Sequence, residues 1–406
     1  MKITILADHI VGGGGAGVVA WNHARALFSQ GHVVTVITTS EKKELEGLKD
    51  ENGISVFTLY SKYPSRVRAY ISLNNHNLVK RVDRILSSIQ PDIVHAHNIH
   101  YHLSYASLKA AKKYAAAIFL TAHDSMSFHY SKLFPQTIDS FGCDIKSYKV
   151  SFLKQLCYFK LSYNPFRNVI IKKYLRIPTK IFAVSNALAQ ALSDNGIKNV
   201  EVLHNGIDVK EWEIGAPISR RDTRDYLFFG GRLSAVKGGM VLMEAMKQVL
   251  PVRSNTRLLV VGEDNDFSRK MEEEAKKIGI DDLILFTGSK SREEMKHMYP
   301  LSTLVVVPSL CFDWFPTIIL EAMACKKAVI GTCFGGAKEM IEDGKTGYVI
   351  NPQNVQELAN AIIDLLNNPH KVDEMGAAGY ERVKKEFSME VHMQKLLAWY
   401  DKALQE

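Results

Sequence analysis

The chain has 406 residues, which is enough for two domains with full cores. Its hydrophobic content of 46% and charged content of 23% are ordinary for a globular protein. No run of 18 apolar residues occurs, so we expect no membrane-spanning helix. Asp8 and His9 interrupt the first apolar run, which argues against a signal peptide.

The net charge of +8 is unevenly distributed. Residues 1–212 carry +11 and residues 213–406 carry −3. The basic half is expected to attract anionic partners such as acidic lipids, phospholipid-linked sugars or nucleic acid.

The cysteines indicate the redox state of the chain. There are five of them at irregular spacing, which predicts reduced thiols and therefore the cytoplasm. Cys143 and Cys157 have no metal-site spacing and are interpreted as structural filler.

The first half alternates predicted strands and helices, and a charged loop separates its second and third strands. The predicted strands are Lys2 to Ala7, Val33 to Thr38, Ser55 to Tyr60, Asp92 to His95, Ala117 to Thr121, Lys180 to Ser185 and Val200 to Leu203; the helices are about Ala16 to Gln30, Asn74 to Ser88 and Asn186 to Asn195. The glycines from Gly12 to Gly17 form a turn that lets the backbone approach a phosphate, and Gly14 and Gly15 are the candidates there. They fit no dinucleotide fingerprint, and a turn without a ligand is the alternative.

Histidines follow two neighbouring strands. His95 and His97, in the stretch HAHNIHYH, share a face if their strand continues, but no carboxylate or cysteine completes a metal set, so we expect no metal. The next strand runs into His123 and Asp124. A histidine at the carboxyl end of a parallel strand can exchange a proton near neutral pH, and a structural histidine is the alternative.

Residues 126–178 are the least regular part of the chain. Aromatic residues and lysines interleave from Tyr148 to Tyr174. Such a segment could lie on a membrane surface or stack nucleic-acid bases, or its aromatics could pack on the domain while its lysines are solvated.

The second half restarts the alternation after a turn at His204 to Asp208 and a linker to about Arg224. A strand from Tyr226 to Gly230 precedes GGRLSAVKGG, where Arg232 and Lys237 flank a glycine turn at a helix start. Two cations and several N–H donors converging on one point suit a diphosphate. Asp264 and Asp266 form a D-x-D pair, which we interpret as a helix N-cap region rather than a metal site.

The stretch from Pro308 to Ile341 begins at the end of an apolar run, Leu304 to Val307, that suits a buried strand. Thr317 to Cys325 has apolar residues at helical spacing, a second apolar run extends from Ala328 to Ile330, and two acids bracket the helix start. Asp313 and Glu321 lie eight residues apart, and the N–H groups of Thr317 and Ile318 could receive a phosphate. Carboxylates accept hydrogen bonds from sugar hydroxyls, so phosphate and sugar together suggest a nucleotide-sugar. Two helices, Val372 to Lys385 and Glu390 to Leu404, are predicted to end the chain.

These motifs resemble those of the retaining glycosyltransferases of family 4. The acidic pair matches the family's two glutamates separated by seven residues, except that Asp313 replaces the first, and GRL…KG resembles the donor-diphosphate motif. The resemblance implies an α/β GT-B fold with two Rossmann-like domains facing each other across a cleft. It places an acceptor-binding domain at residues 1–210, joined by a crossover helix at about 388–406, and a nucleotide-sugar-binding domain at residues 211–387.

The resemblance also implies roles for the candidates. Arg232, Lys237 and the amides of Thr317 and Ile318 would stabilise the departing diphosphate in place of a metal, so no metal or other cofactor is expected. Glu321 would hold the ribose and Asp313 the sugar hydroxyls.

In the first domain, His123 would lie at the transferred sugar with Asp124 beside it. Gly14 and Gly15 would contact the donor phosphate or the acceptor.

The expected function is transfer of a sugar from a nucleoside-diphosphate sugar to a lipid-linked or polysaccharide acceptor in bacterial cell-surface glycan synthesis. We expect a cytoplasmic protein, peripheral at the anionic inner face of the membrane through its basic first domain, and no nucleic-acid partner. A sugar-nucleotide-binding protein that does not transfer and a nucleotide-sugar epimerase of the same fold are the alternatives.

Overall fold

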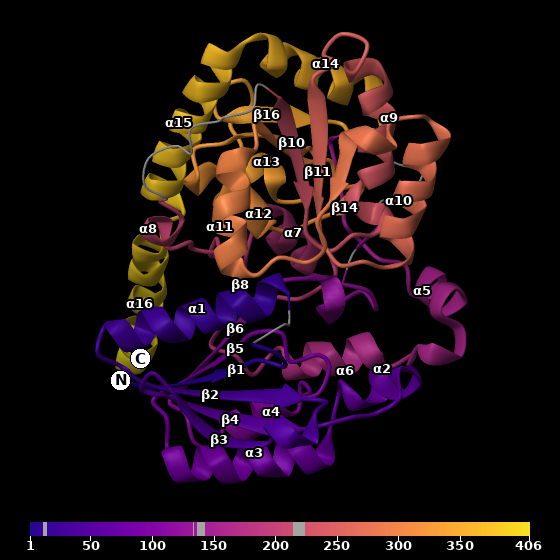
Figure 1. Cartoon of the computed structure of the whole chain (residues 1–406). Coiled ribbons are helices and arrows are strands. Elements are labelled where there is room, and N and C mark those ends of the chain that lie inside the picture. Colours follow the sequence, from indigo (N-terminus) through magenta and orange to yellow (C-terminus); the bar gives the residue numbers. More distant parts are fainter. Residues whose placement is uncertain (11–13, 133, 136–142, 214–223) are drawn as a thin grey trace. The chain divides into compact units, whose positions relative to one another are not determined.

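A computed structural model describes residues 1–10, 14–132, 134–135, 143–213 and 224–406 (Figure 1). The chain forms two compact units. Unit 1 comprises Met1–Lys132, Lys146–Gly206 and Glu390–Glu406, and unit 2 comprises Leu133–Ile145 and Ile207–Met389. The predicted linker between the domains extends into residues 214–223, which lie outside the described residues.

Unit 1 is built on an eight-stranded sheet in the order β3-β4-β2-β1-β5-β6-β8-β9. Its strands are β1 (Lys2–Leu6), β2 (Val33–Ser40), β3 (Gly47–Glu51), β4 (Ile54–Tyr60), β5 (Ile93–Ala96), β6 (Ala117–Ala122), β8 (Lys180–Ala183) and β9 (Val200–Val202). All neighbours pair in parallel except β3 and β4. The central strands are continuous apolar runs because helices cover both faces of a parallel sheet.

The helices of unit 1 follow the strands in the manner of an α/β unit. They are α1 (Gly15–Ser29), α2 (Arg68–Ile71), α3 (His76–Ile89), α4 (Ser107–Ala111), α5 (Phe152–Phe159), α6 (Arg167–Tyr174), α7 (Asn186–Asp194) and most of α16 (Met389–Gln405). The sheet lies between α1 and α3, and the two chain termini lie near each other (Figure 1).

One strand of unit 1 escaped the sequence prediction. The charged stretch expected to be a loop contains β3, which pairs antiparallel with β4. All five residues of β3 are exposed. An edge strand without a buried face has no apolar alternation, so its sequence is typical of a loop.

Unit 2 is built on a six-stranded, fully parallel sheet in the order β12-β11-β10-β13-β15-β16. Its strands are β10 (Asp225–Gly230), β11 (Thr256–Val261), β12 (Ile284–Phe286), β13 (Leu304–Val307), β15 (Ala328–Thr332) and β16 (Gly347–Ile350); its helices are α8 (Val209–Trp212), α9 (Gly239–Val249), α10 (Asp266–Lys277), α11 (Arg292–Leu301), α12 (Thr317–Ala324), α13 (Ala337–Met340), α14 (Val355–Asn367) and α15 (Pro369–Glu386). The α/β prediction is therefore confirmed for both units. Among the described residues, none of the helices combines the length and hydropathy that a transmembrane span requires.

The strand order of unit 2 positions its ligand site. Strand β10 lies between β11 and β13, so the chain leaves β10 toward one side of the sheet and returns on the other. In open α/β sheets, ligands bind beyond the carboxyl ends of the strands at such a switch point. The loops that follow β10 and β13 are those that carry Arg232 and Asp313.

A disulfide contradicts the prediction that the cysteines are reduced. Cys143 is bonded to Cys333, 190 positions away, within unit 2. In the same unit, β7 (Phe134–Pro135) pairs antiparallel with β14 (Cys311–Phe312). The prediction was wrong because an odd cysteine count at irregular spacing carries no information on which distant residues meet in the fold.

Replacing Cys143 by serine is expected to lower the free energy of unfolding of unit 2 by about 2–4 kcal/mol, since the bridge closes a long loop of the unfolded chain. Cys157→Ser is the control, because Cys157 is an exposed free cysteine, and a change below about 0.5 kcal/mol is expected there. Thiol titration of the unfolded chain provides an independent measurement. Three thiols, those of Cys157, Cys311 and Cys325, should react before reduction. Reaction of all five without reductant would contradict the disulfide.

Candidate functional site

The glycine turn after β10 packs directly against the chain that leaves β13. Gly238 has a φ of 81°, and a Cβ added there would lie 1.9 Å from the backbone oxygen of Pro308. The N–H of Leu310 donates to the oxygen of Val236 at 2.8 Å. Only glycine permits both this conformation and this approach.

Replacing Gly238 by alanine is therefore expected to destabilise unit 2 more than a comparable change elsewhere. Gly279→Ala is the matched control, because Gly279 has a φ of 70° but nothing within 4 Å of an added Cβ. Both variants carry the left-handed strain of about 1–2 kcal/mol, and the clash with Pro308 should add about 1–3 kcal/mol for Gly238→Ala. Chemical denaturation of the two variants measures the difference, and equal losses would show that the close approach is not needed.

Lys237 forms an ion pair with Asp313, joining the loops that follow β10 and β13. Burial disfavours the charged form of Lys237, but the Asp313 carboxylate outweighs it, and the pKa of the ammonium is raised. Lys237 is therefore a cation at neutral pH. Arg232 is exposed, and it has no ion pair with any of the described residues.

A third loop fixes the backbone of Asp313. The N–H of Gly336 donates to the oxygen of Asp313 at 2.9 Å. Gly335 has a φ of 70°, and an added Cβ would lie 2.2 Å from that same oxygen. The loops after β10, β13 and β15 thus meet at Lys237 and Asp313.

Glu321 lies in the first turns of α12, where the amides of Thr317 and Ile318 begin the helix. Its Oε2 accepts a hydrogen bond from the Tyr299 hydroxyl at 2.7 Å. Burial raises the pKa of Glu321, although the hydrogen bonds from Tyr299 and Thr317 and the charge of Arg292 oppose this. The first N–H groups of an α-helix have no intrahelical acceptor, so those of Thr317 and Ile318 can donate to an anion.

Two residues around Glu321 were missed by the sequence analysis. Arg292 donates to both carboxylate oxygens of Glu211, at 3.0 and 2.8 Å, and its guanidinium lies over the Trp212 ring. Tyr299 is fully buried and holds Glu321. Neither belongs to a recognisable motif, and each reaches the site only through the packing of α11.

In unit 1, His123 and Asp124 follow β6 and lie in separate hydrogen-bond systems. His123 Nε2 is 2.9 Å from His97 Nδ1. Asp124 accepts from the N–H of Met126 at 2.9 Å and from Asn98 at 3.0 Å. Burial lowers the pKa of His123 to about 3 and raises that of Asp124 to about 6. His123 is therefore neutral at pH 7 and can take part in hydrogen bonds as a neutral ring.

His123 is partly buried and lies beside four buried histidines in unit 1, which are His23, His95, His97 and His392. His95 and His97 stack with ring centroids 4.6 Å apart, and His23 stacks on His392 at 4.4 Å. His95 also bonds to Tyr400 and Thr121, at 2.5 and 2.7 Å. Among the described residues, no group of three or more His, Cys, Asp or Glu side chains has an arrangement suited to a metal ion. We name His23, His95, His97, His123 and His392 the histidine core.

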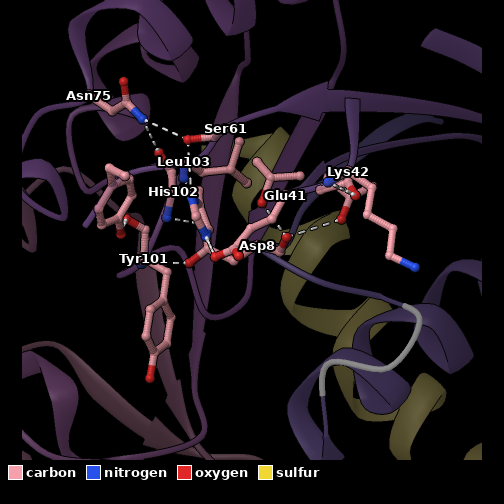
Figure 2. Close-up of polar contacts among 12 residues, drawn as sticks. Asp8, Glu41, Lys42, Ser61, Asn75, Tyr101, His102 and Leu103 are labelled. Atoms are coloured by element: carbon pink, nitrogen blue, oxygen red, sulfur yellow. Dashed lines mark hydrogen bonds and ion pairs between the residues drawn. The ribbon is translucent and has the colours of Figure 1, made fainter. Parts of the chain in front are cut away.

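Asp8 holds the loop that follows β5 and was considered in the sequence only as an interruption of an apolar run. Its carboxylate accepts from the N–H groups of Tyr101, His102 and Leu103 at 2.7, 2.9 and 2.7 Å. Figure 2 shows the Asp8 carboxylate turned toward these three residues. Burial raises its pKa, although these hydrogen bonds oppose the shift. An acid directly after a central strand is the signal that could have identified it.

The glycine turn before α1 is described only in part. Residues 11–13 lie outside the described residues, so the prediction for Gly12 and Gly13 has no structural counterpart. Gly14 is the N-cap of α1, with a φ of 74°, and Gly15 is its first residue; both are exposed. The first N–H groups of this 15-residue helix, next to both candidates, have no intrahelical acceptor.

The D-x-D pair lies at a helix start, as predicted. Asn265 between the two acids is the N-cap of α10, with its side chain accepting from the N–H groups of Phe267 and Ser268. Asp264 and Asp266 both pair with Arg269, at 2.9 and 2.6 Å.

The structure brings the predicted residues together within each unit. Lys237 contacts Asp313, and Thr317 bonds to Glu321 in unit 2. His123 and Asp124 are neighbours in unit 1 but have different partners. The ligand roles assigned to all of these residues stay predictions.

Known proteins resemble this chain in sequence and in fold. Residues 13–211 match a family model described as Glycosyltransferase Family 4, and residues 210–382 match one described as Glycosyl transferases group 1. A lipopolysaccharide 1,2-N-acetylglucosaminetransferase of Salmonella typhimurium is 32% identical over 193 residues, which cover 43% of this chain and 49% of that protein. The chain spans about half the length of several curated relatives that it matches.

Solved structures match over nearly the whole chain. A sucrose-phosphate synthase from Thermosynechococcus elongatus has a TM-score of 0.78 at 18% identity, covering 99% of this chain and 98% of that one. The Anabaena protein HepE, in complex with UDP and glucose, has a TM-score of 0.70 at 18% identity, covering 99% and 100%. The two family matches together extend from residue 13 to residue 382, and the chain belongs to the family 4 glycosyltransferases of the GT-B fold, as its motifs predicted.

Proposed function

We propose that this protein transfers a sugar, with retention of anomeric configuration, from a nucleoside-diphosphate sugar to a lipid-linked or polysaccharide acceptor. The observation that carries the proposal is the meeting of Lys237 and Asp313 at the switch point of unit 2. The loop of Lys237 also bears Arg232, which is exposed and forms no ion pair with the described residues. Such a site offers two cations to a diphosphate and one carboxylate to a sugar. The UDP complex of HepE and the activity named for the Salmonella relative support the same reading.

Charge stabilisation is the main task of the proposed site. As the bond between sugar and diphosphate breaks, negative charge grows on the leaving diphosphate. Arg232, Lys237 and the N–H groups of Thr317 and Ile318 would stabilise it, so that no metal is required. These donors lie on loops and a helix terminus fixed by the sheet, and they need little reorganisation during the reaction.

The carboxylates would orient the sugar parts of the donor. Asp313 would accept hydrogen bonds from hydroxyls of the transferred sugar, and Glu321, held by Tyr299, would accept from the ribose. In unit 1, neutral His123 would accept a hydrogen bond from the sugar, and Gly14 and Gly15 would offer N–H groups to an anionic part of donor or acceptor. The net charge of +11 on residues 1–212 supports an anionic acceptor presented at a membrane surface.

The experiment is a thermal-shift assay with UDP, GDP, ADP and dTDP. The protein is then incubated with nucleotide-sugars that contain whichever nucleotide stabilises it. A nucleotide at 100 times its Kd should stabilise the protein by about 2.7 kcal/mol. Release of that nucleotide, with a product whose anomeric configuration matches the donor by NMR, would support retaining transfer. Binding without any turnover would favour a binding protein, and a free isomerised nucleotide-sugar would favour an epimerase. No stabilisation by any of the four at millimolar concentration would contradict the donor site.

A further inference from the structure

Unit 1 exposes many large apolar side chains along α5, along α6 and in the turn that joins them. Six of the sixteen exposed large hydrophobic residues in the described part of the chain lie between residues 152 and 169: Phe152, Leu153, Tyr158, Leu161, Phe166 and Val169. Leu161 is 98% exposed, Tyr158 79% and Phe166 69%. Single exposed apolar residues are common, but a group of this kind marks an interaction site. We name these six residues the α5–α6 patch.

The exposure does not come from poor packing of α5. The inner side of this helix is anchored: Leu156 and Phe159 pack against a buried cluster that includes Tyr130 and Tyr163. Gln155 is buried, and its side chain accepts from the N–H of Tyr130 at 2.9 Å and donates to a backbone oxygen at 3.3 Å. The opposite side of the helix presents Leu153 and Tyr158 to solvent on a fixed base.

Helix α6 repeats this arrangement. Arg167, at its start, is fully buried and donates to the backbone oxygen of Met126, while Asn168 donates to that of Phe128 at 2.7 Å. Phe166 and Val169 point away from these contacts and are each 69% exposed. Both helices therefore present apolar side chains outward from well-anchored backbones.

The turn between the two helices displays Leu161. Lys160 has a φ of 46°, which is rare for a residue with a side chain. This positive-φ conformation, with a ψ of −132°, costs free energy, and such strain is often found where a segment has a function. It places the almost fully exposed Leu161 next to the exposed Lys160.

The chain segment that carries the patch has charges of a single sign. Residues 145–193 contain nine Lys and Arg residues and no Asp or Glu. Lys149, Lys154, Lys160 and Lys173 are exposed, and they alternate along the chain with the residues of the patch. The patch thus combines apolar side chains with a surrounding positive field.

We propose that the α5–α6 patch is a docking surface for an anionic phospholipid bilayer. Its apolar side chains would enter the boundary between headgroups and acyl chains, and its lysines would contact lipid phosphates. A second copy of this chain fits poorly, because an isologous contact would bring like charges together. Nucleic acid fits poorly as well, since Leu153, Leu161 and Val169 have no π-face on which bases could stack.

The test is co-sedimentation of the full chain with vesicles of phosphatidylcholine alone or with phosphatidylglycerol. The wild type should bind the anionic vesicles at low salt and weaken as salt rises. Leu153→Ser/Leu161→Ser/Phe166→Ser should lower the partition coefficient at least tenfold. Exchanging Lys154 and Lys160 for glutamine should lower it about fivefold for each lysine. All of these residues are exposed, so the variants should fold.

The matched control is Leu48→Ser/Val252→Ser/Leu285→Ser, which removes three exposed apolar side chains outside the patch. It should bind vesicles like the wild type. Cys157, exposed on α5, offers a second measurement, because a polarity-sensitive dye attached there should shift to the blue on binding.

Three results would overturn the proposal: no binding of the wild type at low salt, equal loss in the control and patch variants, or a solution dimer that the patch variant dissociates while vesicle binding is absent. Vesicle binding is measured without nucleotide, so its failure and a failure of the proposed donor site are distinguishable.

Discussion

Replacing Lys237 by alanine is expected to lower kcat/KM for the nucleotide-sugar by about 10²–10³-fold, the usual loss when one charge-stabilising donor is removed from an active site. Of the two cations in the proposed site, Lys237 is the more firmly placed, since its turn packs on Pro308 and its ammonium is paired with Asp313. The stabilisation of the protein by its nucleotide should fall in the same variant. Donor-dependent turnover and thermal shift measure the two effects.

The matched control for this prediction is Lys277→Ala. The Lys277 side chain is 74% exposed on α10 and pairs only at the surface, with Glu274 at 3.2 Å. Exposed pairs of this kind contribute little free energy, at most about 1 kcal/mol. Turnover and nucleotide binding should therefore remain at wild-type levels in this control.

A stability effect must be separated from the loss of charge stabilisation. Lys237→Ala leaves the half-buried Asp313 carboxylate without its partner, which costs about 1–3 kcal/mol. The double variant Lys237→Ala/Asp313→Asn removes both charges and should recover part of the melting temperature without recovering activity. Wild-type turnover in Lys237→Ala would refute the role of Lys237 in stabilising the diphosphate. Recovery of activity in the double variant would show that Lys237→Ala loses activity because it is less well folded.

The sequence predicted the parts of the site that depend on local pattern. Uniform apolar runs identified the strands β10, β13 and β15 within two residues at each end, because strands buried on both faces have little polar content. Arg232 and Asp313 lie in the loops that follow two of these strands, β10 and β13. Since the carboxyl ends of parallel strands meet at one edge, the loops that carry them were expected to share a site.

The parts that escaped prediction are contacts between distant residues. Asp8 bonds to the loop around His102, Cys143 to Cys333, and His23 stacks on His392. Such pairs leave no periodic trace in a single sequence, because neither partner has an unusual neighbourhood in the chain. They appear only when the strand order and the return of α16 to unit 1 are known.

For the segment from Tyr148 to Tyr174, the sequence did not show which aromatic residues are buried. Its composition could not distinguish packed aromatics from exposed ones. In the structure Tyr148 and Tyr163 are buried while Phe152 and Tyr158 are exposed. Packed and exposed aromatic residues thus occur together in this segment.

The second large effect expected is a loss of stability of unit 1 in mild acid, caused by the histidine core. Burial lowers the pKa of His123 to about 3 and that of His392 to about 4, and it lowers those of His23, His95 and His97 well below the usual value. In the unfolded chain these groups titrate near 6.5. Their stabilising contribution is complete above pH 6.5 and is lost as the pH falls toward the folded-state values, because the unfolded chain then binds more protons.

The contribution of two members of the histidine core, His123 and His392, follows from their pKa values. Together, His123 and His392 should lower the free energy of unfolding by about 4 kcal/mol between pH 7 and pH 5. Asp124 has the opposite effect. Its pKa is raised to about 6 in the folded state, so the folded protein binds this proton at a higher pH than the unfolded chain does. Between pH 7 and pH 5 this adds about 1 kcal/mol to the free energy of unfolding. Asp8, also raised, acts in the same direction as Asp124. A net loss of at least about 2 kcal/mol between pH 7 and pH 5 is expected.

His23→Leu provides the sharpest test of this origin. His23 is 1% exposed, and neither of its ring nitrogens has a hydrogen-bond partner among the described residues. Leucine removes a buried polar ring that has no hydrogen-bond partner, which should not destabilise the protein at pH 7. It also removes one proton that unfolding takes up in acid. The slope of the unfolding free energy against pH should therefore fall by about 1.4 kcal/mol per pH unit below pH 6. His370→Leu is the control, because the His370 side chain is 89% exposed. Hydrogen exchange of β5 and β6 reports on unit 1 alone, and an unchanged slope in His23→Leu would show that the histidine core does not set the acid limit.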